Sequence, residues 1–388
     1  MRDIGSNIPK MYWLRFFTSF WLIVPVLIPF YQANGLSASQ VFIVQSIFNL
    51  AMVLFDVPTG YISDIIGRRR TIIIASFAMP AGLAIYAFSH SFLAFAAAEI
   101  VLAFSWGLRS GTDSALVYET LLEEERKDEF RKFEGRAAFF ERFGDATAAI
   151  LGSAIAIISL RMPFYINVFT GMALIPIAFM LLEPKRDKVV KHDHLKEILK
   201  AVKYAVSHPQ VGPLMLYFSI IFAVSITCVW SYYFYYKSIG LSVGWFGIIH
   251  AGFGILSGLG SMQAHRIEAK IGRKTTLYLM LIIGMNLILL GLIKSVFMIA
   301  AVLVNGFLLG LAWPLLNDYI NKLVNSDIRA TVLSTASMGR GLFFGLFAPA
   351  FGFVTDKFSL SCAFLSIGYV YIGALMFTLW LLNRNKAI

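Results

Sequence analysis

The chain has 388 residues, of which 58% are hydrophobic and only 14% are charged, and it carries 33 Lys and Arg against 22 Asp and Glu. Its mean hydropathy of +0.73 indicates more apolar surface than one globular core could bury. This excludes a soluble protein and predicts a polytopic membrane protein. Both cysteines lie inside apolar runs, and the sequence has no metal-ligand or nucleophile constellation, so we expect no cofactor, no metal and no enzyme activity.

Apolar runs of about 20 residues, the length that crosses a bilayer, recur along the whole chain. They predict an all-α fold of twelve membrane-spanning helices, divided into six-helix bundles at residues 1–183 and 211–388. The expected spans are 11–33, 40–62, 71–90, 92–118, 136–160, 163–183, 211–236, 243–264, 275–293, 295–320, 330–355 and 360–382.

The distribution of basic residues predicts the topology. An even number of spans places both termini on one side of the membrane, and most Lys and Arg fall in the loops of that side. Because basic loops stay in the cytoplasm, we expect both termini to be cytoplasmic in a multi-pass protein of the cell membrane. The formal charge of +11 then reflects contact with lipid headgroups, and nucleic-acid binding is not expected.

Charged residues within the second and fourth spans must face protein or water, because one facing lipid costs about 2.5 to 3.5 kcal/mol at the bilayer centre. On the fourth span, Glu99, Arg109 and Asp113 fall within about 80° of one another around a helix. On the second span, Asp56 lies eight residues before Asp64 (64 minus 56) and can face the same interior.

The loop after the second span, "GYISDIIGRRR", begins at Gly60. Gly67 permits a sharp turn between two helices, and Asp64 can meet the partial positive charge of a helix N-terminus. We therefore expect a tight turn at Gly67 and a contact of Asp64 with the end of a helix.

The fifth span carries a second group of charges, Glu141, Arg142 and Asp145, in which Arg142 and Asp145 are spaced to pair. A carboxylate in a partly dry cavity can take up a proton on one side of a membrane and release it on the other. Glu99 is the first candidate for this role, because its nearest arginine in the same helix is ten residues away (109 minus 99), about 15 Å. Asp145 and Asp56 follow. Structural ion pairs that never titrate are the alternative.

Residues 184–210 connect the two halves. Their sequence "HDHLKEILKAVKYAVSHP" spaces apolar residues at helical intervals between lysines and predicts an amphipathic helix on the cytoplasmic membrane surface, ended by Pro209. In the second half, His250 and Arg340 hold places comparable to the charges of the first half. The residues expected to line the substrate cavity are Arg109, Glu141, Arg142, His250 and Arg340.

An internal repeat links the halves. A shift of 205 residues (236 minus 31), without a gap, superimposes identical residues: Tyr31 on Tyr236, Gly67 on Gly272, Arg68 on Arg273 and Asp113 on Asp318. A duplicated six-helix bundle is typical of transporters that place a substrate site between two rocking halves.

The loop resembles the signature loop of the major facilitator superfamily, Gly-x-x-x-Asp-x-x-Gly-Arg-Lys/Arg-Lys/Arg, and "HRIEAKIGRKT" is similar to a degraded copy in the second half. The resemblance implies that Gly60, Asp64, Gly67 and Arg68 belong to a gate, in which Asp64 latches the two halves and Arg68 pairs with Asp113. The repeat adds Arg273 with Asp318. Ala269 replaces the copy's latch aspartate, so the second latch should be weaker.

In length and span count the chain is similar to the drug/proton antiporters of that superfamily. This implies a proton-coupled secondary active transporter that works by alternating access, as a monomer in the lipid bilayer, and exports amphiphilic small molecules. It departs from their pattern at Glu99 and in the fifth span, which has only Gly144 and Gly152 of the expected glycines. A proton-coupled symporter that takes up a small solute, such as an anion, is the alternative. A transporter-derived receptor or sensor is the remote one.

Overall fold

The computed structural model describes residues 3–185, 203–204, 207–324 and 326–385. In this part of the chain the secondary structure is helical and contains no strand, as the apolar runs predict. The amphipathic helix expected within 184–210 falls mainly on residues outside the described ranges.

The first half forms nine α-helices. They are α1 Asn7–Ser19, α2 Leu27–Ala33, α3 Ala38–Ile66, α4 Arg68–Phe88, α5 Phe92–Arg109, α6 Thr112–Glu123, α7 Phe130–Ala156, α8 Met162–Met172 and α9 Leu174–Met180. The second half contains α11 Val211–Ser238, α12 Gly244–Ile271, α13 Arg273–Leu279, α14 Leu281–Leu292, α15 Ile299–Leu323, α16 Ser326–Lys357 and α17 Leu360–Arg384.

Each of the twelve expected spans coincides with one helix or with consecutive shorter ones, and the twelve-helix fold is confirmed. Among the described residues, eleven helical stretches are long and apolar enough to cross a membrane. The helix outside this set is α7, which has 27 residues but carries the charged group of the fifth span. The charged residues along α7 lower its mean hydropathy without shortening it.

Two spans are interrupted for identifiable reasons. The first is divided between α1 and α2 by a short 3-10 turn that contains Pro25, a residue that removes a backbone donor. The fourth is divided at Gly111, whose φ of +75° ends α5 and begins α6. Asp113 therefore lies in the first turn of a new helix.

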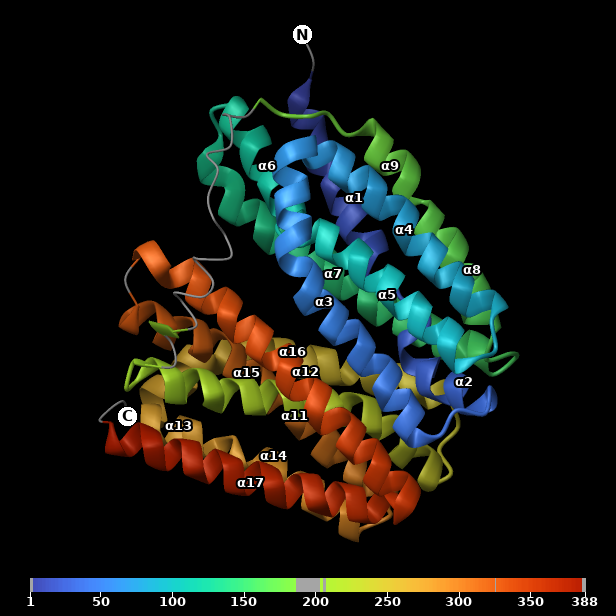
Figure 1. Ribbon diagram of the computed structural model, residues 1–388, viewed down its shortest axis with the longest axis vertical. Coiled ribbons are helices and arrows are strands. Elements are labelled where there is room, and N and C mark those ends of the chain that lie inside the picture. Colours follow the sequence, from blue (N-terminus) through green and yellow to red (C-terminus); the bar gives the residue numbers. More distant parts are fainter. Residues whose placement is uncertain (1–2, 186–202, 205–206, 325, 386–388) are drawn as a thin grey trace. The chain divides into compact units, whose positions relative to one another are not determined.

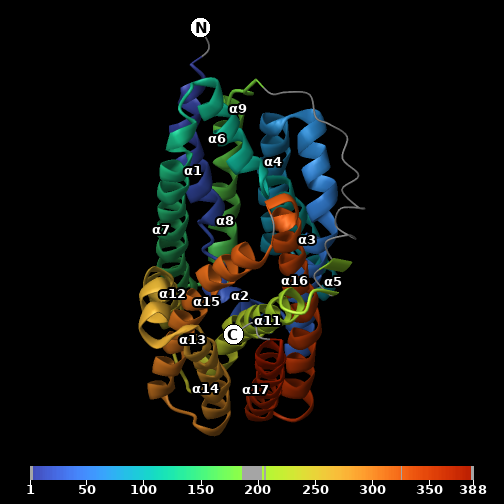
Figure 2. The same cartoon turned by 90° about the vertical axis from the view of Figure 1, so that its left-hand side faces the viewer.

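The helices form two compact units. Unit 1 comprises Met1–Asn34, Ile47–His192 and Val243–Ala251, and unit 2 comprises the remaining segments. In unit 1, α4 packs on α5 and α8 while α1 packs on α7 (Figures 1 and 2). In unit 2, α11 packs on α16 and α17, and α14 packs on α17 (Figure 1). The units differ from the expected halves at the first turns of α3 and α12.

Candidate functional site

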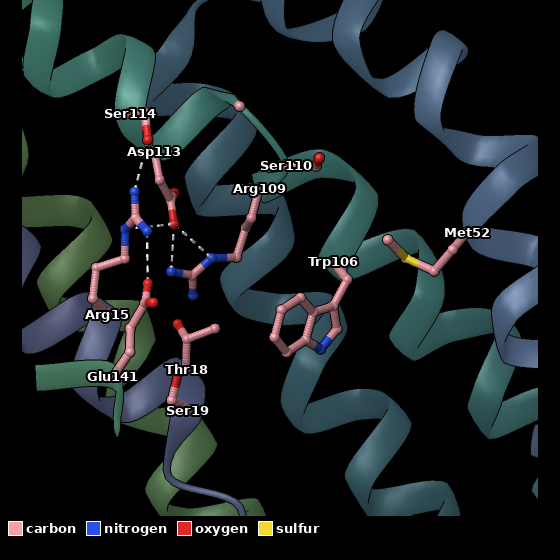
Figure 3. A pocket seen from close by; sticks show the side chains of 11 residues that line it. Arg15, Thr18, Ser19, Met52, Trp106, Arg109, Ser110, Asp113, Ser114 and Glu141 are labelled. Carbon is pink, nitrogen blue, oxygen red and sulfur yellow. Dashed lines mark hydrogen bonds and ion pairs between the residues drawn. The ribbon is translucent and has the colours of Figure 1, made fainter. Parts of the chain in front are cut away.

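Unit 1 contains a pocket of about 250 Å³ that receives side chains from α1, α3, α5, α6 and α7 (Figure 3). Most of the residues that line it have polar or charged side chains. It consists of four ionisable side chains, Arg15, Arg109, Asp113 and Glu141, together with Thr18, Ser19, Ser110, Gly111, Ser114, Met52 and Trp106.

The four ionisable side chains form a connected network. Arg109 donates through Nη2 and Nε to Asp113 Oδ2, at 2.6 and 3.1 Å. Arg15 donates through Nη1 to Glu141 Oε1 at 2.6 Å and through Nη2 to Ser114 Oγ at 2.9 Å. The two pairs meet at Asp113, whose Oδ2 lies 3.7 Å from Arg15 Nε. Figure 3 shows these four groups pointing toward one another.

The network is buried but incomplete. Arg109 is 5% exposed and Asp113 is 6% exposed. Within the described residues, Arg109 Nη1 and Asp113 Oδ1 are buried and have no hydrogen-bond partner. A buried polar atom without a partner costs about 1 to 3 kcal/mol, so each needs an explanation.

Two of the five residues expected in the substrate cavity, Arg109 and Glu141, line this pocket. Asp113, which was expected in the gate, lines it as well, and Arg15 was not among the expected residues. Arg15 lies inside the first expected span, 11–33, and an arginine within an apolar run is the signal that could have identified it. Arg142, expected beside Glu141, is exposed.

Glu99 lies outside the pocket lining, in a separate buried site of α5. It is 5% exposed and accepts hydrogen bonds from the hydroxyl groups of Tyr86, at 2.6 Å, and Tyr31, at 3.2 Å. The two tyrosine hydroxyl groups also hydrogen-bond to each other. Asp56 is half-buried on α3, one turn after the pocket residue Met52.

The expected pairing of Arg142 with Asp145 is wrong. Asp145 Oδ1 instead lies 3.5 Å from Nε2 of His250, at the start of α12. The physical reason is the orientation of α7, which buries Gly144 and leaves Arg142 exposed. Two predicted site residues, Asp145 and His250, are thereby brought together.

The signature loop is organised around Gly67, whose φ is +103°. The backbone N–H groups of Arg68 and Arg69 both donate to the carboxylate of Glu183, at 2.8 Å each, and so the start of α4 is capped. Gly67 also has no room for a side chain, because a Cβ there would lie 2.6 Å from Glu183 Oε1.

The expected pairing of Arg68 with Asp113 is also wrong. Arg68 pairs with Asp64 at 2.7 Å and with Glu119 at 3.1 Å. The break at Gly111 turns Asp113 toward Arg109, whereas Glu119 is six residues (119 minus 113) farther along α6, about 9 Å, and reaches the loop. An acid on the fourth span does bind the motif arginine, but it is a different acid.

The mirrored pairing of Arg273 with Asp318 is likewise not formed. Asp318 pairs with Lys322 at 2.6 Å. The guanidinium group of Arg273 lies 3.9 Å from the ring centroid of Tyr319, whose hydroxyl donates to Glu268 at 2.6 Å. Arg273 therefore contacts the aromatic ring of Tyr319, whereas Arg68 in the first half contacts carboxylates. The repeat keeps the position of the arginine but not the kind of partner.

The other predicted residues are not among those that line the pocket. Gly272 repeats the conformation of Gly67 with a φ of +83°. Gly60 lies within α3 and has space for a Cβ. In unit 2, the guanidinium group of Arg340 lies over the rings of Trp313 and Phe222, at 4.6 and 5.3 Å.

A protein-family model described as Major Facilitator Superfamily matches residues 14–245 and again 214–387. Comparison with curated protein sequences gives no significant match.

Solved structures with a similar fold include three membrane transporters. They are the nucleoside transporter NupG (14% identity, 100% of both chains covered, TM-score 0.79), a D-xylose-proton symporter (15%, 97% of both chains, 0.73) and a POT family transporter in complex with 5-aminolevulinic acid (12%, 99% of this chain and 96% of that chain, 0.74). At these identities the similarity concerns the fold.

Proposed function

Because the chain belongs to the Major Facilitator Superfamily, we propose that it is a proton-coupled secondary active transporter of a small polar solute, working by alternating access. The observation that carries the proposal is the charged pocket of unit 1. Ionisable side chains within membrane-spanning helices are costly, and they typically mark substrate or ion pathways.

The pocket lining supports a polar solute over an amphiphilic one. Its four ionisable side chains and the hydroxyl groups of Thr18, Ser19, Ser110 and Ser114 can form hydrogen bonds with a polar solute. An amphiphilic molecule would cover these groups with apolar surface and leave them without partners, at a cost in binding free energy. Export of amphiphilic molecules, the first expectation from the sequence, is therefore less favoured than its alternative.

For the direction of transport we favour uptake by symport. A polar solute crosses a bilayer slowly without help, because its polar groups lose their hydrogen bonds to water. A cell therefore needs a carrier to take it up, whereas amphiphilic molecules enter unaided. One of the proteins with a similar fold is a D-xylose-proton symporter, which supports this direction.

For the coupling proton we propose Glu99 first, Asp145 second and Asp56 third. Glu99 is buried and accepts hydrogen bonds from the hydroxyl groups of two tyrosines, apart from the ion pairs of the pocket. The gate is assigned to the signature loop, with Asp64 and Arg68 on the cytoplasmic side, where we also place both termini. The moving bodies are the halves at 1–183 and 211–388.

The test is transport by the purified protein in liposomes with an imposed proton gradient of either sign. The probes are a labelled panel of amino acids, sugars and nucleosides, with ethidium as the amphiphilic cation. Accumulation of a polar probe driven by an outside-acid gradient is the expected result. Accumulation only under an inside-acid gradient, or transport of ethidium alone, would establish the export alternative. Transport unaffected by either gradient would rule out proton coupling.

A further inference from the structure

We propose that the pocket of unit 1 binds a small zwitterion, with its carboxylate on Arg109 and its ammonium group between Asp113 and Glu141. The proposal rests on the proposed function and specifies its substrate class. Three features of the pocket carry it: its charge balance, its unsatisfied atoms and its size.

The first feature is the balance of charge. Two arginines and two carboxylates line the pocket. A solute without net charge keeps this balance, whereas a charged one leaves an uncompensated charge in a buried site, which is costly. A third carboxylate, Glu134, is outside the lining, with its Oε1 3.6 Å from Arg15 Nη2, and adds negative charge beside that arginine. A simple anion is therefore disfavoured relative to a solute that also carries a positive group.

The second feature is a donor and an acceptor that belong to one ion pair. In the described part of the chain, Arg109 Nη1 and Asp113 Oδ1 have no hydrogen-bond partner. The donor needs an anionic or neutral acceptor, which a simple cation does not provide. The acceptor needs a donor, which a simple anion does not provide. Only a solute with both kinds of group satisfies both, and charged groups form the stronger bonds.

The third feature is the size and shape of the pocket. Its volume of about 250 Å³ is below the usual range for drug-sized ligands, about 300 to 1,000 Å³. Trp106 and Met52 lie on the side away from Arg15 and Glu141 (Figure 3). The charged groups can therefore bind the two ends of a short solute while the apolar side chains contact its few carbon atoms.

The experiment measures binding to the protein in lipid nanodiscs, by calorimetry and without a proton gradient. Two matched sets of probes differ only in charge: alanine, propanoate and ethylammonium, and 4-aminobutanoate, butanoate and butylammonium. We expect at least one zwitterion to bind about tenfold more tightly than both of its singly charged analogues. Equal binding within both sets, tighter binding of an analogue, or no binding of any probe would overturn the assignment.

Variants then locate the site. Glu141→Gln keeps the size of a partly exposed side chain but removes the charge that meets the ammonium group. It should reduce the preference for the zwitterion over the matching anion to about one. Glu129→Gln, in the exposed loop before α7, is the matched control and should keep the preference. A preference unchanged in Glu141→Gln would also overturn the proposal.

These outcomes are separate from those of the transport test. Selective binding of a zwitterion without gradient-driven transport would contradict the proposed function and leave the binding site intact. Gradient-driven transport of a sugar, combined with no preference among the charged probes, would support the proposed function and contradict the zwitterion site.

Discussion

Gly67 has a backbone conformation that only glycine adopts without strain, with φ +103° and ψ 154°. This residue ends α3, leaves the N–H groups of the next two residues free to be capped by Glu183, and has no space for a Cβ. The sequence predicted a sharp turn at this glycine. It could not identify Glu183 as the cap, because the two residues are 116 positions apart (183 minus 67).

We predict that Gly67→Ala lowers the stability of unit 1. Backbone strain of this kind costs about 1 to 3 kcal/mol, and displacement of Glu183 would add the loss of the cap. The measurement is thermal unfolding of the detergent-solubilised protein. Gly135→Ala is the control, because a Cβ at this helical position meets nothing within 4 Å. Equal melting temperatures of the two variants would refute the claim.

Glu99 is the first candidate for the residue that carries the coupling proton. Glu99→Gln retains an oxygen that can accept from Tyr86 and Tyr31 but cannot release a proton. We expect this variant to lose gradient-driven transport and to retain exchange of solute across the membrane, with a rate that no longer depends on pH. Both activities are measured in liposomes.

Asp145→Asn is the next variant to compare, and Asp128→Asn in the loop before α7 is the control. Normal pH dependence in both Glu99→Gln and Asp145→Asn would leave Asp56 as the candidate. Gradient-driven accumulation that survives in Glu99→Gln, in Asp145→Asn and in Asp56→Asn would exclude all three carboxylates as the proton carrier.

At the scale of helices, the break between α5 and α6 explains what the sequence could not predict. A continuous helix places Glu99, Arg109 and Asp113 on one stripe, and Arg109 and Asp113 are in contact although the helix breaks between them at Gly111. Gly111 has a left-handed backbone conformation, so α6 takes a direction different from that of α5, and the partner of Arg68 is Glu119. Helical periodicity cannot predict this change of direction, and so it could not identify the acid that reaches Arg68.

The contact between Arg68 on α4 and Glu119 on α6 can be tested by exchanging the two charges. Arg68→Glu and Glu119→Arg should each impair transport, whereas the double variant should recover part of it, because the attraction is restored with the charges exchanged. A coupling energy of about 0.5 to 3 kcal/mol is typical of residues in contact. Arg70→Glu makes the same charge change at an exposed residue of the loop and should have a small effect. Losses that simply add in the double variant would show that the two side chains are not coupled.

For the whole molecule, the sequence predicted the number of spans and the repeat, since the length of apolar runs is set by the thickness of the bilayer. It predicted less of the pocket. Arg109 and Glu141 were expected there, but Arg15 was passed over, because a single arginine near the start of a span looks like part of a basic loop. The repeat likewise suggested that Arg273 would have a carboxylate partner, where the structure has Tyr319.

We predict that Asp64→Asn shifts the transporter toward the state open on the side of the signature loop. Ser110, which lines the pocket, is replaced by cysteine in a protein without Cys228 and Cys362, and labelled with a membrane-impermeant maleimide. Labelling from the loop side should increase in Asp64→Asn, and labelling from the other side should decrease. Arg70→Gln, in the same loop, should leave both unchanged. Unaltered labelling and transport in Asp64→Asn would show that Asp64 does not act as a latch.

Glu183 links the signature loop to the segment that connects the two halves. The same carboxylate that binds the start of α4 belongs to the residue just before the connecting segment 184–210. Tension on that segment would therefore pull directly on the signature loop. A shortened connection, a bulky insertion or a protein bound to it should alter how readily the gate opens, even though none of them touches the pocket.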